Sequence, residues 1–265
     1  MRRALRAAGL LPIAFTVWRT VRYWNPSRIA RDMRLRRTAD RALPIPPGNL
    51  LLVTGATRDV DWFLTSGIAT ADAFRSALQR IDRPIGSFRS VLDFGCGCGR
   101  VLRQWREVTG PTLHGTDYNP RLVGWCNENL RCATVTQNDL SPPLAYPDAR
   151  FDLCYAVSVF THLPEPMQDA WLRELHRVIE PDGILIVTLS GEGDLIRTTP
   201  EEQERFRVGA LVVVDGSFAG TNMCGAYHPA SYIRSHWSRY FKLLDFVSEG
   251  ARGSPNQDLY VLQRL

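Results

Sequence analysis

Three glycines stand at alternate positions in residues 91–100, VLDFGCGCGR, directly after an apolar run and Asp93. The run is too short for a helix, and apolar residues then follow at helical spacing at Val101, Leu102 and Trp105, so the pattern predicts a strand, a tight loop and a helix. Glycine permits positive φ and close backbone approach, and the N–H groups that open a helix attract electron-rich groups. The loop is therefore expected to bind a flat, polar ligand such as a nucleoside.

The spacing of these glycines separates two kinds of nucleoside site. Dinucleotide-binding folds use G-x-G-x-x-G, with the pyrophosphate at the start of the helix. This loop reads G-x-G-x-G, and Asp93 before it would repel a pyrophosphate and suits a cationic amine. The motif resembles the first motif of the class I S-adenosylmethionine-dependent methyltransferases, an acidic residue followed by x-G-x-G-x-G. The resemblance implies S-adenosyl-L-methionine as cofactor, S-adenosyl-L-homocysteine as product, and contacts to the cofactor from Asp93, Phe94, Gly95, Cys96, Gly97 and Gly99.

A second carboxylate follows the next expected strand, residues 112–117. In a βαβ unit an acidic residue at this strand end can accept hydrogen bonds from both ribose hydroxyls, which assigns that role to Asp117, with Tyr118 beside it. The alternative is a turn-forming aspartate before Asn119 and Pro120.

A third strand is expected over residues 133–136, and polar residues follow it at once. The resemblance implies that Asp139 accepts a hydrogen bond from the adenine amine and that the next backbone N–H, of Leu140, donates to the ring. Asn138 belongs to the same predicted contact. A helix-capping or turn role for Asp139 is the alternative.

The fourth expected strand is a long apolar run beginning at Phe151, which is typical of a central parallel strand. Residues 158–162 should then face the methyl-transfer pocket, with Ser158 near the cofactor. Methyltransferases that act on nucleobase amines carry an [Asn/Asp]-Pro-Pro-aromatic motif here, whereas this chain reads SVFTHL, which resembles the small-molecule branch. His162 is a candidate general base, and a role in ordering the loop or stacking beside the cofactor is equally open.

The repeated strand-helix order of the remaining elements predicts an α/β fold with a doubly wound, Rossmann-like sheet and an N-terminal helical extension. The resemblance implies that the sheet has seven strands in the order 3-2-1-4-5-7-6, with the last strand antiparallel. A helix from Pro166 and a strand over 184–189 continue the alternation, and a helix over 229–240 and strands over 243–247 and 259–263 end it. Between these, residues 191–228 are expected to form a substrate lid with a hairpin at Asp215-Gly216. Candidate acceptor contacts in the lid are Thr221, Asn222, Cys224, Tyr227 and His228, with His228 a second candidate base.

The length of 265 residues fits one large core, so we expect a basic extension over 1–47 and one catalytic domain over 48–265. The first 41 residues hold eleven arginines against two aspartates, a net charge of +9, and the remaining residues carry −4. The basic charge thus lies outside the predicted domain, which argues against a nucleic-acid groove. The six cysteines lack paired C-x-x-C spacing, which favours neither disulfides nor a metal site and indicates a reducing, cytoplasmic compartment.

The first 41 residues, called the leader below, have three possible interpretations. Its apolar part, residues 10–18, is well short of the ~20 residues that span a bilayer. A basic start and an apolar middle resemble a signal peptide, but no A-x-A cleavage site follows. Leu11, Phe15 and Trp18 share a helical face flanked by arginines, as in a segment lying on anionic lipid, although Arg22 falls on the same face and Pro12 interrupts the first turn. Plain packing or a loose extension is the third interpretation.

Together these patterns predict a methyltransferase that transfers the sulfonium methyl by in-line attack to an oxygen, nitrogen or carbon of a small-molecule, glycan or lipid-type acceptor, with O- or N-methylation favoured. Two other functions fit parts of the sequence. One is an NAD-type oxidoreductase on the same fold, which the glycine spacing disfavours. The other is a non-catalytic nucleotide-binding or membrane-surface protein that works through its leader.

Overall fold

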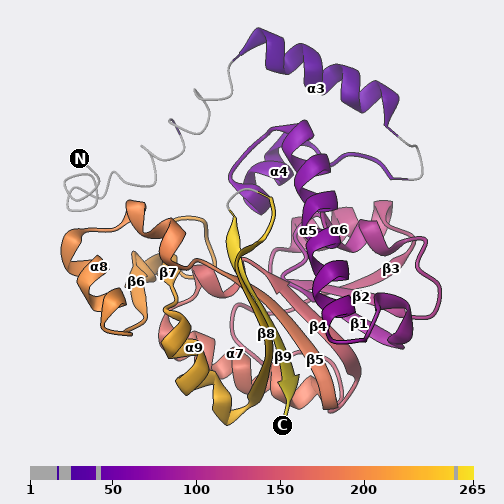
Figure 1. Ribbon diagram of the computed structural model, residues 1–265. Coiled ribbons are helices and arrows are strands. Elements are labelled where there is room, and N and C mark those ends of the chain that lie inside the picture. Colours follow the sequence, from indigo (N-terminus) through magenta and orange to yellow (C-terminus); the bar gives the residue numbers. More distant parts are fainter. Residues whose placement is uncertain (1–16, 18–24, 40–42, 254–255) are drawn as a thin grey trace.

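A seven-stranded sheet with helices on both faces forms the centre of the computed structural model, which describes residue 17 and residues 25–39, 43–253 and 256–265 (Figure 1). The strands lie in the order β3-β2-β1-β4-β5-β9-β8. Strands β1 to β5 are parallel, and β9 is antiparallel to both β5 and β8. The predicted fold class and order are therefore confirmed. The sheet strands are β1 Ser90–Phe94, β2 Thr112–Asp117, β3 Ala133–Gln137, β4 Phe151–Val157, β5 Ile179–Leu189, β8 Phe241–Ala251 and β9 Gln257–Arg264.

Both faces of the central strands are buried because successive side chains of a strand point to opposite sides. In β4, Leu153 and Tyr155 pack on the face covered by α5 (Val60–Arg80) and α6 (Pro120–Asn129). Cys154 and Ala156 pack on the other face, under α7 (Glu165–Val178) and α9 (Ala230–His236). This two-sided burial explains why β4 and β5 are apolar runs and not alternating patterns.

Polar residues directly before the helices fix where several of them begin. The Asp59 carboxylate accepts a hydrogen bond from the Trp62 N–H at 3.1 Å and starts α5. Asn119 caps α6 in the same way, with Pro120 in the first turn. Thr199 and Glu202 form a capping box at the start of α8 (Pro200–Arg207).

The segment after the glycine loop differs from the prediction. It is a short 3₁₀ turn, Leu102–Trp105, and not an α-helix. Val101, Leu102 and Trp105 are buried as expected, but they share one apolar cluster with residues of α5. The helix α5 therefore covers the face of the sheet that a longer helix after the loop would occupy.

Two further elements also differ from the sequence prediction. A helix that was not predicted, α4 (Gly48–Gly55), precedes α5, which begins at Val60 and ends at Arg80. The lid hairpin pairs β6 (Val212–Val214) with β7 (Gly225–Tyr227), and a 3₁₀ turn lies between them after Asp215. The Asp-Gly pair thus begins a long connection and does not form a two-residue turn.

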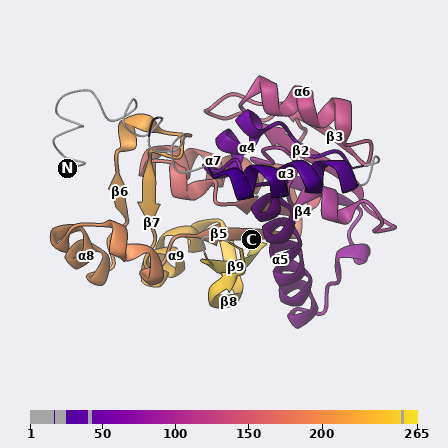
Figure 2. The same ribbon diagram turned by 90° about the horizontal axis from the view of Figure 1, so that it is seen from above.

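The described part of the N-terminal extension packs on α5. In α3 (Pro26–Thr38), Asp32 accepts a hydrogen bond from the Val60 N–H at 3.2 Å, and Arg31 pairs with Asp61 at 2.8 Å. Seen from above, α3 runs beside α4 across one end of α5 (Figure 2). The predicted interfacial stretch of the leader lies outside the described residues, apart from residue 17. Within the described ranges, no helix combines the length and apolar character needed to cross a bilayer.

Replacing Gly99 by alanine should destabilise the fold by about 1–3 kcal/mol. Gly99 has φ +67°, and a Cβ there would lie 2.2 Å from Leu130 Cδ1. The matched control is Gly124→Ala on α6, where a Cβ meets nothing within 4 Å and helix propensity should raise stability by about 0.5–1 kcal/mol. Urea unfolding of both variants measures the difference, and equal free energies of unfolding would contradict the packing role of Gly99.

Candidate functional site

A cavity of about 1030 Å³ opens at the carboxyl ends of β1, β2, β4 and β5. Ligands of open α/β sheets bind at this edge, where the strand order reverses between β1 and β4. Eleven of the twelve residues predicted for the cofactor line this cavity: Asp93, Phe94, Gly95, Cys96, Gly97, Asp117, Tyr118, Asn138, Asp139, Leu140 and Ser158. Gly99 is absent from the lining and packs instead against Leu130.

The glycine loop is bent so that its N–H groups meet the end of β2. Gly95 and Gly97 both have positive φ, at 74° and 57°. The Gly95 N–H donates to the Thr116 carbonyl at 2.8 Å, and the Gly97 N–H donates to Asp117 Oδ2 at 2.9 Å. A side chain at Gly97 would lie 2.7 Å from Thr54 Cγ2, so this loop position has room for glycine alone.

Asp117 combines burial with two backbone hydrogen bonds. Its Oδ1 accepts a hydrogen bond from the Asn119 N–H at 2.9 Å, and its Oδ2 accepts one from the Gly97 N–H of the glycine loop. Burial raises the pKa of Asp117, and the two backbone N–H groups act against that rise. A carboxylate oxygen accepts more than one hydrogen bond, so both oxygens can still receive a hydroxyl from a ligand.

Asp93 is the most deeply placed acid of the cavity, with 2% of its surface exposed. Burial raises its pKa from 3.8 to about 7, although hydrogen bonds from Tyr155 and from the Leu102 N–H and the charge of Arg100 act in the opposite direction. A cationic ligand group beside Asp93 would therefore stabilise the carboxylate that burial disfavours.

The loop after β3 forms the neighbouring wall. The Asn138 N–H donates to the Asp117 carbonyl at 3.2 Å, and the indole N–H of Trp171 donates to the Leu140 carbonyl at 3.1 Å. These bonds hold the loop against the end of β2 and against α7. Asn138, Asp139 and Leu140 consequently line the same cavity as Asp117.

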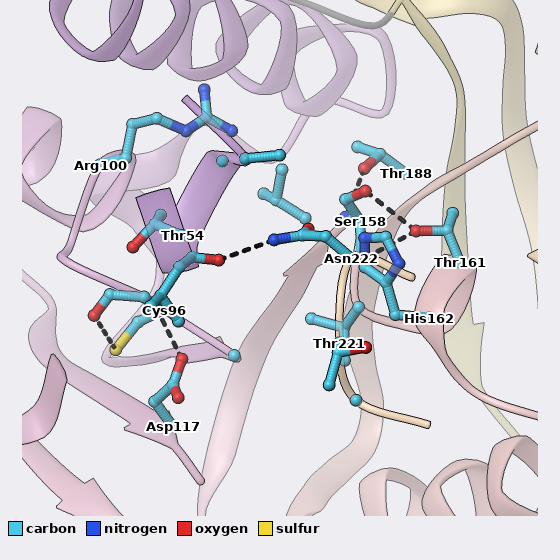
Figure 3. A pocket seen from close by; sticks show the side chains of 18 of the residues that line it. Thr54, Cys96, Arg100, Asp117, Ser158, Thr161, His162, Thr188, Thr221 and Asn222 are labelled. Carbon is cyan, nitrogen blue, oxygen red and sulfur yellow. Dashed lines mark hydrogen bonds between the residues drawn. The ribbon is translucent and has the colours of Figure 1, made fainter. Parts of the chain in front are cut away.

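Ser158 occupies the end of β4 with φ +60°, an uncommon conformation for a residue other than glycine. A hydrogen-bond network holds it there. Its N–H donates to Thr188 Oγ1 at 2.8 Å, and Gln257 Nε2 donates to its hydroxyl at 2.8 Å. Thr188 Oγ1 in turn donates to Gln257 Oε1 at 2.7 Å, and Thr161 Oγ1 lies 2.9 Å from Ser158 Oγ. Figure 3 shows Ser158, Thr161 and Thr188 on the opposite side of the pocket from Cys96 and Asp117.

The two candidate bases lie in different environments. His162 lines the cavity, and its Nδ1 donates to the Cys224 carbonyl at 2.8 Å, which leaves Nε2 as the acceptor nitrogen. Burial lowers the pKa of His162, so the ring is neutral at physiological pH.

His228 lies outside the cavity lining and has no exposed surface. Its Nε2 is 3.0 Å from Gln168 Oε1, and because the Gln168 amide donates to the Phe160 and Leu163 carbonyls, its oxygen must accept from His228. Burial lowers the pKa of His228 to about 3. The position of His228 does not support the expected contact with an acceptor.

The segment predicted as a lid, residues 191–228, makes three hydrogen bonds to separate elements around the cavity. Asn222 Nδ2 donates to the Val53 carbonyl of α4 at 2.9 Å, as the dashed line from Asn222 in Figure 3 shows. The Gly220 N–H donates to the His162 carbonyl at 2.8 Å, and its carbonyl accepts from the Tyr118 hydroxyl at 2.8 Å. Thr221, Asn222, Cys224 and Tyr227 line the cavity, so four of the five predicted lid contacts lie there.

Residues 92–187 match the sequence model of a methyltransferase domain. This segment is a methyltransferase domain. Together with the observed strand order, the match confirms the resemblance to class I S-adenosylmethionine-dependent methyltransferases, a family whose cofactor is S-adenosyl-L-methionine.

Curated relatives resemble the methyltransferase domain over part of their length. The chain is 34% identical to the 2-methyl-6-phytyl-1,4-hydroquinone methyltransferase of Synechocystis over 37% of this chain and 31% of that protein. It is 30% identical to the malonyl-[acyl-carrier protein] O-methyltransferase of Enterobacter lignolyticus over 52% of this chain and 50% of that protein. The chain therefore spans half or less of the length of these two relatives.

Solved structures share the fold of the methyltransferase domain. A SAM-dependent methyltransferase from Methanosarcina mazei superposes with a TM-score of 0.50 at 18% identity, over 66% of this chain and 92% of that one. Human N-acetylserotonin methyltransferase in complex with SAM gives a TM-score of 0.51 at 16% identity, over 75% of this chain and 51% of that one.

Several residues of the methyltransferase cavity were not predicted from the sequence. Thr54, Thr188 and Gln257 reach it from α4, β5 and β9, and no motif marks any of them. Arg100 is different, because a charged residue directly after the last glycine of the loop was a visible signal to which no role had been given.

The variant Asp93→Asn should be more stable than the wild type above pH 7 and lose that advantage near pH 4. Because the pKa of Asp93 rises from 3.8 to about 7 on folding, its carboxylate opposes folding at high pH and is protonated in both states at low pH. The gain is at most about 4 kcal/mol. Thermal and urea unfolding between pH 4 and pH 8 measure it, and parallel pH curves for the two proteins would contradict the effect.

Proposed function

We propose that the chain binds S-adenosyl-L-methionine in this cavity and transfers its methyl group to a small-molecule acceptor. The observation that carries the proposal is the convergence of Asp93, the glycine loop, Asp117 and residues 138–140 on one cavity at three successive strand ends. In this arrangement Asp117 accepts the ribose hydroxyls, Asp139 accepts from the adenine amine, and Asp93 faces the amino group of the methionine part.

The reaction consistent with this site is an in-line displacement. An acceptor oxygen or nitrogen attacks the methyl carbon, the carbon–sulfur bond breaks, and the electron pair remains on sulfur as S-adenosyl-L-homocysteine. The proton that the acceptor loses passes to His162 Nε2, since Nδ1 is occupied by the Cys224 carbonyl. Aligning the two reactants in a closed cavity can supply about 7–11 kcal/mol of the barrier, so an acceptor that is already anionic needs no base.

The acceptor class follows from the size of the cavity and from the relatives. A volume of about 1030 Å³ is at the upper end of the usual range for one ligand site, about 300–1,000 Å³, which leaves room for an acceptor beside the nucleoside. The two relatives are named for a hydroquinone and for a malonyl group on a carrier protein. Supporting evidence for the lid, residues 191–228, as the acceptor-binding segment is that four of its side chains line the cavity opposite the loop.

Calorimetry should detect binding of S-adenosyl-L-homocysteine to the full chain and none of NAD. Asp117→Asn should weaken that binding by about 10- to 100-fold, because hydrogen bonds to a charged group contribute about 1.5–3 kcal/mol. Asp169→Asn on α7, which pairs with His236 away from the cavity, is the matched control. Tight NAD binding with no response to the nucleoside would favour the oxidoreductase alternative.

We also propose that α3 brings the domain to an anionic membrane surface. The arginines of α3 that face the protein are paired, Arg28 with Asp59 and Arg31 with Asp61. The outer face instead carries exposed Ile29 and Met33, 46% and 51% accessible, with exposed arginines in the same helix. A basic helix with apolar residues on its outer face suits an interface of anionic headgroups and acyl chains.

Replacing two of the exposed arginines of α3, Arg34→Glu with Arg37→Glu, should reduce sedimentation with phosphatidylglycerol vesicles by at least about tenfold, since each basic residue near an anionic surface contributes about 1 kcal/mol. Neutral phosphatidylcholine vesicles should bind neither protein. The control is the double reversal Arg131→Glu with Arg173→Glu at exposed sites on other elements. Equal sedimentation of the α3 variant and the control would reject the membrane contact.

A further inference from the structure

The cavity opens to solvent at a rim whose side chains are mostly apolar. Four of its lining residues are exposed, and three of these have large apolar or aromatic side chains: Val53 is 38% accessible, and Tyr118 and Leu140 are each 37% accessible. The fourth is Asp139. The side chains of Val53, Tyr118 and Leu140 are called the apolar rim below.

The predicted lid connects the three residues of the apolar rim. The Asn222 side chain donates to the Val53 carbonyl at 2.9 Å, and the Tyr118 hydroxyl donates to the Gly220 carbonyl at 2.8 Å. A Cβ at Gly220 would lie 2.5 Å from Leu140 Cδ1, so Leu140 lies against the same stretch. Exposed apolar side chains that gather at one place mark a contact site for an apolar molecule or surface.

The wall that the predicted lid gives to the cavity is uncharged. The lid side chains in the lining are those of Thr221, Asn222, Met223, Cys224 and Tyr227. Among the described residues, the lid adds no carboxylate, lysine, arginine or histidine to the cavity. Burying a charged group against such a wall costs free energy, because the wall supplies no partner for the charge. An alkyl amine is charged at neutral pH, so an uncharged hydroxyl is the nucleophile that suits this wall.

The helix α3 borders the same cavity. Its Arg28 is a lining residue and pairs at 3.6 Å with Asp59, which also lines the cavity, so the two charges compensate each other. Ile29 follows Arg28 directly and Met33 lies one turn later, and both are exposed. Figure 1 shows α3 and α4 at the end of the sheet where the cavity opens. The helix that carries the proposed membrane contact therefore also contributes to the cavity wall.

We propose that the methyl acceptor is an uncharged, hydroxyl-bearing amphiphile of the membrane, whose head group enters the cavity and whose apolar tail leaves it across the apolar rim. This inference rests on the proposed methyl transfer and the proposed membrane contact, and it deepens both. In the transfer a bond forms between the hydroxyl oxygen and the methyl carbon. The carbon–sulfur bond breaks with its electron pair kept on sulfur, and the hydroxyl proton passes to His162 Nε2.

The test measures binding of 4-octylphenol, 4-ethylphenol and octyl phosphate to the full chain by calorimetry, with S-adenosyl-L-homocysteine bound. The wild type should bind octylphenol about 10- to 100-fold more tightly than ethylphenol, because burying a few methylene groups at the rim gives a difference of that size. Octyl phosphate has the same tail with an anionic head group, and it should bind at least about tenfold more weakly than octylphenol. Equal affinities for the two phenols, or tighter binding of octyl phosphate, would overturn the inference.

Variants at the rim test the path of the tail. Val53→Asp should lower the preference for octylphenol over ethylphenol by about tenfold, since a carboxylate at the rim loses water when the tail covers it. Val53→Leu, which keeps an apolar contact, should keep the preference. Ile68→Asp is the matched control, because Ile68 is 51% accessible on α5 and lies outside the cavity lining. A folded Val53→Asp protein with the full preference contradicts the proposed path, and thermal unfolding establishes that each variant is folded.

Vesicles distinguish a membrane amphiphile from a dissolved one. With S-adenosyl-L-homocysteine bound, the wild type should sediment with phosphatidylglycerol vesicles at about threefold lower lipid concentration when they carry octylphenol, because the bound probe adds to the membrane contact. Val53→Asp should not respond to the probe. Unchanged sedimentation of the wild type rejects the membrane as the source of the acceptor. A wild type that binds the nucleoside but none of the probes overturns this inference alone, whereas one that does not bind the nucleoside overturns the proposed function as well.

Discussion

The attachment of the glycine loop to the end of β2 is the constraint on which the site depends. The N–H groups of Gly95 and Cys96 both donate to the Thr116 carbonyl, at 2.8 and 2.9 Å, and the Gly97 N–H donates to the Asp117 side chain. The carboxylate of Asp117 therefore has a structural task before any ligand arrives. Because the same residue also lines the cavity, the loop and the second strand end are held at a fixed separation, and a nucleoside can contact both without rearranging them.

Burial gives the charged groups of this site their chemical character. Asp93 and His228 are both enclosed, and in each case loss of water disfavours the charged form. The two buried groups differ in their chemistry because different side chains surround them. Asp93 faces a cavity with Arg100 beside it, whereas His228 has only the Gln168 amide oxygen and lies edge-on to the Trp237 ring. A buried acid at a cavity is poised for a cationic partner. The buried neutral imidazole of His228 has one hydrogen bond, and its Nδ1 has no hydrogen-bond partner among the described residues.

The parts of the fold that depend on local patterns were predictable, and those that depend on distant partners were not. Apolar runs, strand ends and the glycine loop predicted the alternating strands and helices of a doubly wound sheet, because each parallel strand and its crossover lie together in sequence. The order of the strands came from the resemblance to a family. The network around Ser158 was not accessible, since Gln257 lies 99 residues further along the chain and no motif connects the two. The predicted acceptor contact of His228 failed for a similar reason. The sequence around a histidine does not show whether its ring faces a ligand or the core. The segment after the glycine loop was predicted to be an α-helix, but it is a short 3₁₀ turn. In the structure α5 covers this face of the sheet, and because α5 precedes the loop in the chain, the pattern after the loop did not reveal it.

Two stretches that line the cavity and contact each other both lie outside residues 92–187, the part that matches the methyltransferase family. Val53 lies in α4 and Asn222 in the lid, and one hydrogen bond of 2.9 Å joins them. The residues proposed to bind the nucleoside and the segment proposed to contact the acceptor are thus separate stretches of the chain. A chimaera can exchange residues 191–228 for another segment and leave residues 92–187 unchanged, so the boundary between the two is a natural junction for grafting.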